Sequence, residues 1–327
     1  MNKVALLSVE DRQALFGETA SLMNTTSAII EKDFWVVWVL DKLFANDDLQ
    51  KLLMFKGGTS LSKVFNLIGR FSEDIDLILD WREVSDEDPW AEKPSKTQQN
   101  KFNNKINEVA KTYIRNKLLP VIQQVLSPVC SCELSKDDGF TIYVTYPATF
   151  KDKYLRSEIL LEIGPLASWA PSDVYQVSSY ASQYFPKLFD KPVCQVNAIV
   201  AKRIFWEKAT ILHQEANRPN DKLMPLRYSR HYYDLAIMAK SEVVDSALGD
   251  IELLAKVVEF KNKFYPSSWA NFDTAKPGSI KLAPNQSRIG ELEKDYKAME
   301  NMIFDKKLSF EEIVNILQKL EDKINQI

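Results

Sequence analysis

The fold is decided by residues 52–80, which read LLMFKGGTSLSKVFNLIGRFSEDIDLILD. A short apolar run, Leu52–Phe55, ends at a glycine pair, and residues Ser60–Ile68 return to helical spacing. Apolar residues then alternate with aspartates over Asp74–Asp80, as expected for a strand with acids on one face. The stretch therefore predicts a strand, a glycine turn, a helix and an acid-bearing strand in succession.

The segments on either side extend this pattern into a mixed sheet with helices. Upstream, apolar residues recur at helical spacing over Ser27–Phe44, which predicts a long helix. Downstream, the acidic stretch 81–99 contains prolines and predicts an exposed loop, followed by a helix over Asn100–Leu126. Runs rich in Ile, Val, Tyr or Leu predict further strands at Phe140–Tyr146 and Ser157–Ile163.

Beyond residue 192 the pattern is mostly helical. Helices are predicted at Val196–Ala216, Tyr228–Lys240, Asp250–Phe264 and Gly290–Phe304, with a last one begun by a capping box at Ser309. We therefore predict an α+β protein, with a sheet-containing domain and its N-terminal helices over residues 1–190 and a mainly helical domain over residues 191–327.

Composition narrows the classes of protein. The 327 residues are 45% hydrophobic, which suffices for a buried core, and no run approaches the roughly 20 apolar residues that cross a membrane. Three cysteines without repeated spacing and no N-terminal signal segment predict a cytoplasmic protein without a disulfide framework. The net charge of −3 argues against nucleic-acid binding by bulk charge alone, although a local basic patch stays open.

Any metal is expected to be a hard cation held by carboxylates, because two histidines and separated cysteines offer little for zinc. Asp74 and Asp76 are two residues apart on a predicted strand, so both side chains project from one face and can share a divalent cation. Glu162 is the predicted third ligand, because an acid buried in an apolar strand would need a cation or a basic partner.

The glycine pair predicts a phosphate-binding loop. Gly57 and Gly58 allow the backbone to approach a phosphate closely, and Thr59, Ser60 and Lys63 can add contacts. Taken alone, a Gly-Gly turn is usually only a turn, and a lone Asp-Ile-Asp is common on exposed strands. Their succession along the chain favours a triphosphate site over these ordinary explanations.

The same stretch resembles a known family. Residues 55–63 (FKGGTSLSK) and 70–77 (RFSEDIDL) are similar to the signature of the AbiEii/AbiGii toxin family of nucleotidyltransferases. Further similar segments are residues 31–35 (EKDFW), 162–164 (EIG), 206–209 (WEKA) and 230–235 (RHYYDL). The resemblance thus extends from about residue 31 to residue 236.

The resemblance implies a polymerase beta-like nucleotidyltransferase fold with Asp74 and Asp76 as metal ligands. It also implies catalytic roles for Lys208 and Asp234 beside that of Glu162. The predicted nucleotide-binding residues are Lys56, Gly57, Gly58, Thr59, Ser60, Lys63, Ser72 and Arg230.

Several of these residues have ordinary explanations too. Lys208 is a helix lysine that would be read as solvated without the resemblance, which favours triphosphate contact. Asp234 is equally well a structural partner of Lys208 or Arg230. Lys32 and Asp33 are secondary candidates, which ordinarily mark the polar edge of a helix, and His231 stands where many family members carry aspartate.

The predicted activity is transfer of a nucleotidyl group from a nucleoside triphosphate to an acceptor hydroxyl, with Mg²⁺ or Mn²⁺ as cofactor. The resemblance implies a toxin of a toxin–antitoxin or anti-phage system, with a cognate antitoxin protein. RNA such as tRNA is one candidate acceptor, and a protein or a small molecule stays open beside it. A two-metal phosphodiesterase or nuclease is the first alternative, because such sites serve both reactions. A non-catalytic nucleotide-binding module is the second.

Overall fold

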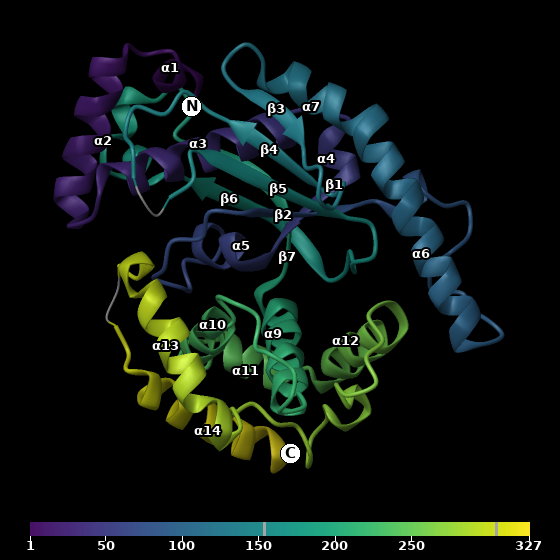
Figure 1. Ribbon diagram of the computed structural model, residues 1–327. Coiled ribbons are helices and arrows are strands. Elements are labelled where there is room, and N and C mark those ends of the chain that lie inside the picture. The colour runs from purple at the N-terminus through teal and green to yellow at the C-terminus, as the bar shows by residue number, and fades with distance from the viewer. Residues whose placement is uncertain (153–154, 305–306) are drawn as a thin grey trace. The chain divides into compact units, whose positions relative to one another are not determined.

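The computed structural model describes residues 1–152, 155–304 and 307–327 (Figure 1). The chain forms two compact units. Residues 1–64 and 72–199 form the first, here called the sheet unit, and residues 65–71 and 200–327 form the second, here called the helical unit.

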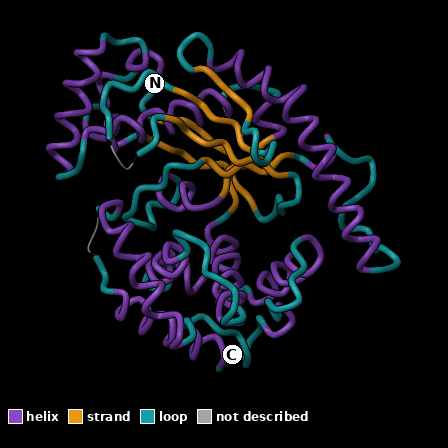
Figure 2. The backbone as a smooth tube through the Cα atoms, viewed as in Figure 1, coloured by secondary structure: helices purple, strands orange, loops and turns teal. Residues whose placement is uncertain are grey.

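One seven-stranded sheet organises the sheet unit (Figure 2). Its spatial order is β3-β4-β5-β2-β1-β7-β6, and the sheet is mixed because β2 pairs with β5, and β1 with β7, in parallel. The strands are β1 (Leu53–Lys56), β2 (Ile75–Leu79), β3 (Ser131–Leu134), β4 (Thr141–Thr145), β5 (Glu158–Gly164), β6 (Ser172–Ser178) and β7 (Val193–Ile199). The two strands predicted to carry the chemistry, β1 and β2, are therefore central.

Helix α3 (Ser27–Phe44) is the core helix of the sheet unit. The Thr26 hydroxyl accepts a hydrogen bond from the Ile29 amide and caps its start, and almost all residues from Ile29 to Phe44 are buried. It packs against β5, β7 and four other helices of the unit, so its apolar and its charged side chains both contact protein. The other helices of this unit are α1 (Asn2–Ala5), α2 (Val9–Met23), α4 (Leu49–Leu52), α5 (Gly57–Lys63), α6 (Lys96–Tyr113), α7 (Leu119–Leu126) and α8 (Tyr180–Tyr184).

The helical unit contains α9 (Ala201–Ala216), α10 (Ser229–Met238), α11 (Val243–Leu248), α12 (Ile251–Phe264), α13 (Ile289–Met299) and α14 (Phe310–Asn325). Segment 65–71 joins this unit although it lies between two elements of the sheet unit in the chain. Its attachment is a short antiparallel bridge: the Phe71 amide donates to the Met302 carbonyl at 2.7 Å, and the Phe304 amide donates to the Gly69 carbonyl at 2.8 Å.

The predicted class, a mixed sheet with helices followed by a mainly helical part, is confirmed. Residues 193–199 were predicted partly as helix but form β7, which pairs with β6 along its whole length. The sheet unit consequently extends to Ile199, beyond the predicted boundary at residue 190. Helix α6 begins at Lys96 rather than Asn100, because the Ser95 hydroxyl caps it by accepting from the Gln98 amide.

Within the described ranges, none of the helices is both long and apolar enough to cross a membrane.

Candidate active site

The glycine turn brings backbone directly against Asp76. Gly57 follows the last residue of β1 and has φ +82°, a conformation that L side chains rarely adopt. A Cβ atom added to Gly57 would lie 1.9 Å from Oδ2 of Asp76. Glycine is thus required here for its backbone conformation and for the space that the Asp76 carboxylate occupies.

Hydroxyl groups hold the turn and the start of α5 in place. The Thr59 hydroxyl donates to the Asp74 carbonyl, and the Ser60 hydroxyl donates to the Gly57 carbonyl at 2.8 Å. Both residues are buried. Thr59 therefore ties the glycine loop to the segment that enters β2, and we assign it a structural contact beside its predicted nucleotide-binding role.

Three functional candidates lie side by side across the centre of the sheet. Lys56 of β1 pairs in register with Asp76 of β2, and Asp76 pairs in register with Glu162 of β5. Residues paired in this way point to the same face of a sheet, with Cβ atoms roughly 5 Å apart. We call Lys56, Asp76 and Glu162 the central row. Asp74 lies just before β2, two residues from Asp76 and toward the same face.

The central row faces solvent more than predicted. Glu162 is exposed although its neighbours Leu161 and Ile163 are buried, and Asp74 and Asp76 are half-buried. The expectation that Glu162 is a buried acid is wrong, because the two faces of β5 alternate and Glu162 is on the open one. Its register beside Asp76, rather than its burial, makes it a candidate ligand.

The carboxylates are chemically suited to a hard divalent cation, but the described residues do not form a group of three metal ligands. Oxygen donors of Asp76 and Glu162 suit Mg²⁺ or Mn²⁺ by their chemistry. Among residues 1–152, 155–304 and 307–327, no three His, Cys, Asp or Glu side chains are grouped so as to hold a metal ion. The three predicted ligands, Asp74, Asp76 and Glu162, are therefore not gathered into one cluster in this conformation.

Within the helical unit, Lys208 and Asp234 lie in a buried ion network with Arg70. Arg70 binds Asp234 in a bidentate manner, at 2.7 Å through Nε and at 2.8 Å through one terminal nitrogen, and Lys208 Nζ lies 2.8 Å from Oδ2 of Asp234. Asp234 is fully buried, and Lys208 is only 6% exposed. The solvated reading of Lys208 is wrong, and Asp234 partners Lys208 and Arg70.

This network sets the protonation of its members. The two cations hold the pKa of Asp234 well below its usual range, against the opposing effect of burial. Burial lowers the pKa of Lys208, and Asp234 opposes that shift. Arg70 is not among the residues predicted for the site, because its partner Asp234 lies 164 residues away in the chain.

Arg230 and His231 lie at the start of α10, both partly exposed. Burial, helped by the positive charges of Lys208 and Arg230, lowers the pKa of His231 well below its ordinary value. His231 packs edge to face against Tyr228, with ring centroids 5.0 Å apart. His231 is therefore a neutral packing residue at neutral pH.

Two predicted residues are more buried than their pattern indicated. Lys32 and Asp33 have no exposed surface, so the view that they mark the polar edge of α3 is wrong. Lys63, predicted to contact nucleotide, forms an ion pair with Asp33. Ser72 is half-buried at the start of the second part of the sheet unit.

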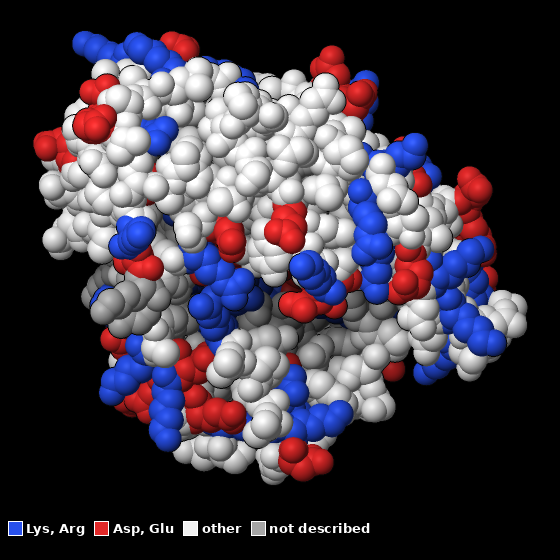
Figure 3. Space-filling view, turned by 45° about the horizontal axis from the view of Figure 1, so that its top comes forward, with Lys and Arg blue, Asp and Glu red and all other residues white. Residues whose placement is uncertain are grey.

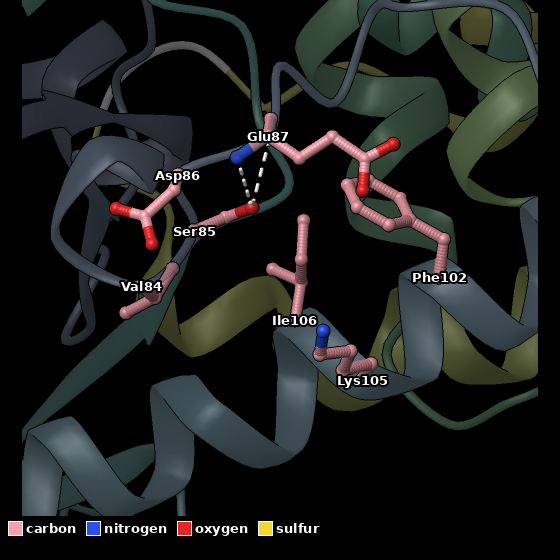
Figure 4. A pocket seen from close by; sticks show the side chains of 7 residues that line it. All are labelled: Val84, Ser85, Asp86, Glu87, Phe102, Lys105 and Ile106. Atoms are coloured by element: carbon pink, nitrogen blue, oxygen red, sulfur yellow. Dashed lines mark hydrogen bonds between the residues drawn. The ribbon is translucent and has the colours of Figure 1, made fainter.

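A separate pocket of about 240 Å³ lies elsewhere in the sheet unit (Figure 4). It is lined by Val84, Ser85, Asp86, Glu87, Phe102, Lys105 and Ile106. The Ser85 hydroxyl accepts from the Glu87 amide at 3.1 Å, which closes a tight turn at its edge. None of the predicted site residues lines this pocket, which is therefore distinct from the central row and the glycine turn.

Solved structures similar to this chain share little sequence with it. A comparison with curated protein sequences finds no match. Among solved structures, similar chains include MenT4, a nucleotidyltransferase toxin from Mycobacterium tuberculosis H37Rv, at 15% identity and TM-score 0.42, with 96% of this chain and 97% of that chain covered. JHP933 from Helicobacter pylori is 15% identical with TM-score 0.44, and 92% of this chain and 95% of that chain are covered.

The family assignment rests on the family model. The model described as "Nucleotidyl transferase AbiEii toxin, Type IV TA system" matches residues 38–316, which include β1, the glycine turn, both aspartates, Glu162 and the ion network of the helical unit. The chain therefore belongs to the AbiEii family of nucleotidyltransferase toxins.

Proposed function

We propose that the protein transfers a nucleotidyl group from a nucleoside triphosphate to an acceptor hydroxyl in a metal-dependent reaction at the central row. The observation that carries the proposal is the register Lys56–Asp76–Glu162, with Gly57 packed against the Asp76 carboxylate. The carboxylates of Asp76 and Glu162, on neighbouring strands, and the ammonium of Lys56 are thus charged groups in adjacent positions beside the glycine turn. This arrangement suits a reaction in which triphosphate charge must be held and redistributed.

In this proposal Asp74, Asp76 and Glu162 are the ligands of Mg²⁺ or Mn²⁺. When bound, the cation would neutralise triphosphate charge and help to orient the attacking hydroxyl. Gly57 and Gly58 give the triphosphate access to backbone, and Lys56 contributes positive charge beside Asp76. Ser60 keeps the turn in shape through its bond to the Gly57 carbonyl.

Lys208, Asp234 and Arg230 remain proposed functional residues of the helical unit. The bond between Lys208 and Asp234, together with the low exposure of Lys208, favours a role for Lys208 in holding Asp234, which also binds Arg70. Removing the Asp234 carboxylate would leave two buried cations, Lys208 and Arg70, without it.

We further propose that the acceptor is RNA, such as tRNA, and that a cognate antitoxin protein neutralises the enzyme, as the family name suggests. With a formal net charge of −3, and with acidic and basic side chains interspersed on the face shown in Figure 3, RNA would be recognised by local contacts. Salt should therefore weaken RNA binding less steeply than for a strongly basic protein.

The test is incubation of purified protein with Mg²⁺, each labelled nucleoside triphosphate in turn, and bulk RNA. An Asp74→Ala, Asp76→Ala double variant serves as the control. Label that enters RNA only with the intact protein supports the proposal and names the nucleotide. Shortened RNA would overturn it in favour of a phosphodiesterase, and tight nucleotide binding without transfer to any acceptor would favour a binding module.

A further inference from the structure

Helix α3 carries three consecutive charged residues in the core of the sheet unit. Glu31, Lys32 and Asp33 are at most 1% exposed, in a helix whose other buried residues are mostly apolar. Burying a charge is costly unless it is paired and hydrogen-bonded. Each of the three must therefore have partners, and the identity of those partners indicates what the residues do.

Lys32 reaches the segment that leads into the acid strand. Its ammonium lies 2.6 Å from a carboxylate oxygen of Glu73 and donates to the Arg156 carbonyl at 2.9 Å. Glu73 is 7% exposed and immediately precedes Asp74. The position of Asp74 is thus linked by one peptide bond to a buried ion pair on α3.

Asp33 reaches the helix that follows the glycine turn. Its carboxylate forms an ion pair with Lys63, the last residue of α5, and accepts from the Tyr180 amide at 2.7 Å. The Lys63 ammonium also lies 3.6 Å from the centroid of the Tyr180 ring. Lys63 is consequently held from two sides, and with it the seven-residue helix that begins at Gly57.

We propose that Lys32 and Asp33 are positioning residues. They attach the segment that leads into β2, and helix α5 after the glycine turn, to the same turn of α3. The inference rests on the proposed function, because it assigns these residues to the geometry of that site. Their opposite charges also specify the pairing, since the alternative of Lys32 with Lys63 and Asp33 with Glu73 would set like charges together. A rigid helix thereby sets the spacing between the two halves of the site.

Glu31 offers a matched control on the same helix. Its carboxylate accepts from the Thr149 and Phe150 amides at 2.8 and 2.9 Å and from the Thr149 hydroxyl at 2.9 Å. It is as buried as Lys32 and Asp33, but it holds neither the acid segment nor α5. A variant at Glu31 should disturb folding without moving the site.

The test compares four proteins: the native chain, Glu31→Gln, Lys32→Met with Glu73→Gln, and Asp33→Asn with Lys63→Met. Each double variant removes both charges of a pair, so no buried charge is left alone and the fold is retained. Thermal melting is recorded first, and nucleotide transfer with its kcat and KM is then measured on the folded proteins.

Loosening the Lys32–Glu73 pair should lower kcat by about 100-fold, because misplacing reacting groups by about 1 Å has that effect. Loosening the Asp33–Lys63 pair should mainly raise KM for the nucleoside triphosphate. The proposal is overturned if kcat and KM of both double variants lie within about 2-fold of those of Glu31→Gln. A native chain that transfers no nucleotide would instead refute the proposed function, and the two failures are thereby distinguished.

Discussion

Replacing Gly57 by alanine should damage the site more than the fold. Alanine at φ +82° costs roughly 1–2 kcal/mol of stability, because a Cβ atom is crowded in this backbone conformation. Its Cβ would also lie 1.9 Å from Oδ2 of Asp76, whereas non-bonded atoms of this kind need at least about 3 Å. The Asp76 carboxylate must therefore move by about 1 Å, which corresponds to a loss of about 100-fold in kcat/KM.

Gly139 provides the control for backbone strain. It also has a positive φ, +71°, but an added Cβ would meet only the flexible side chain of Lys111 at 3.3 Å. Gly139→Ala should therefore lose similar stability with nearly native kcat/KM for labelled nucleotide transfer. If Gly57→Ala and Gly139→Ala lose the same stability and retain the same activity, the argument that Gly57 makes room for the Asp76 carboxylate is refuted.

Three other variants test separate parts of the account. Asp234→Asn should destabilise the protein by about 3–5 kcal/mol in urea unfolding, because two buried cations lose their carboxylate; a change below about 1 kcal/mol would contradict this. Glu162→Gln should abolish most transfer, whereas Glu158→Gln on the same strand should not, and equal effects would remove Glu162 from the site. Burial keeps the pKa of His231 below 6.5, so the unfolded chain binds more protons and stability falls between pH 7 and 5, by up to about 1.4 kcal/mol per unit. In His231→Phe this part of the pH dependence should disappear. If urea unfolding shows the same loss of stability from pH 7 to pH 5 in His231→Phe as in the native chain, the prediction is contradicted.

Local signals predicted the elements that carry the site. The helix Ser27–Phe44 was predicted with its observed bounds, because its apolar spacing is sustained and Thr26 caps it. The strand Ile75–Leu79 was predicted from the alternation of Ile75 and Leu77 with Asp74 and Asp76. Both patterns depend on nearby residues only, which is why the sequence alone sufficed.

Non-local pairing accounts for most of what was missed. Residues 193–199 were read partly as helix, because a short apolar run does not distinguish a buried strand from a helix. Strand β6 is a mostly exposed edge strand with little apolar signal, and it forms by pairing with β7. Pairing partners of this kind are set by the sheet as a whole.

The candidate site is predicted from the sequence in its composition, but the contacts that support it are not. The sequence proposes Asp76, Glu162 and the glycine turn as candidates, whereas their register across three strands follows only from the sheet topology. Charged residues such as Lys32 and Arg70 carried no sign of burial in their local pattern. Their roles became evident only from partners far away in the chain, Glu73 and Asp234.

The most direct test of the central claim is nucleotide transfer by an Asp76→Asn variant, measured across a titration of Mg²⁺. The variant keeps the size of the side chain and removes its charge, and Asp173→Asn on the exposed edge strand is the matched control. We predict that Asp76→Asn lowers transfer by at least about 100-fold at every Mg²⁺ concentration, with unchanged melting temperature, while the control transfers like the native chain. Transfer by Asp76→Asn within about 3-fold of the native chain would contradict the claim that the reaction takes place at the central row.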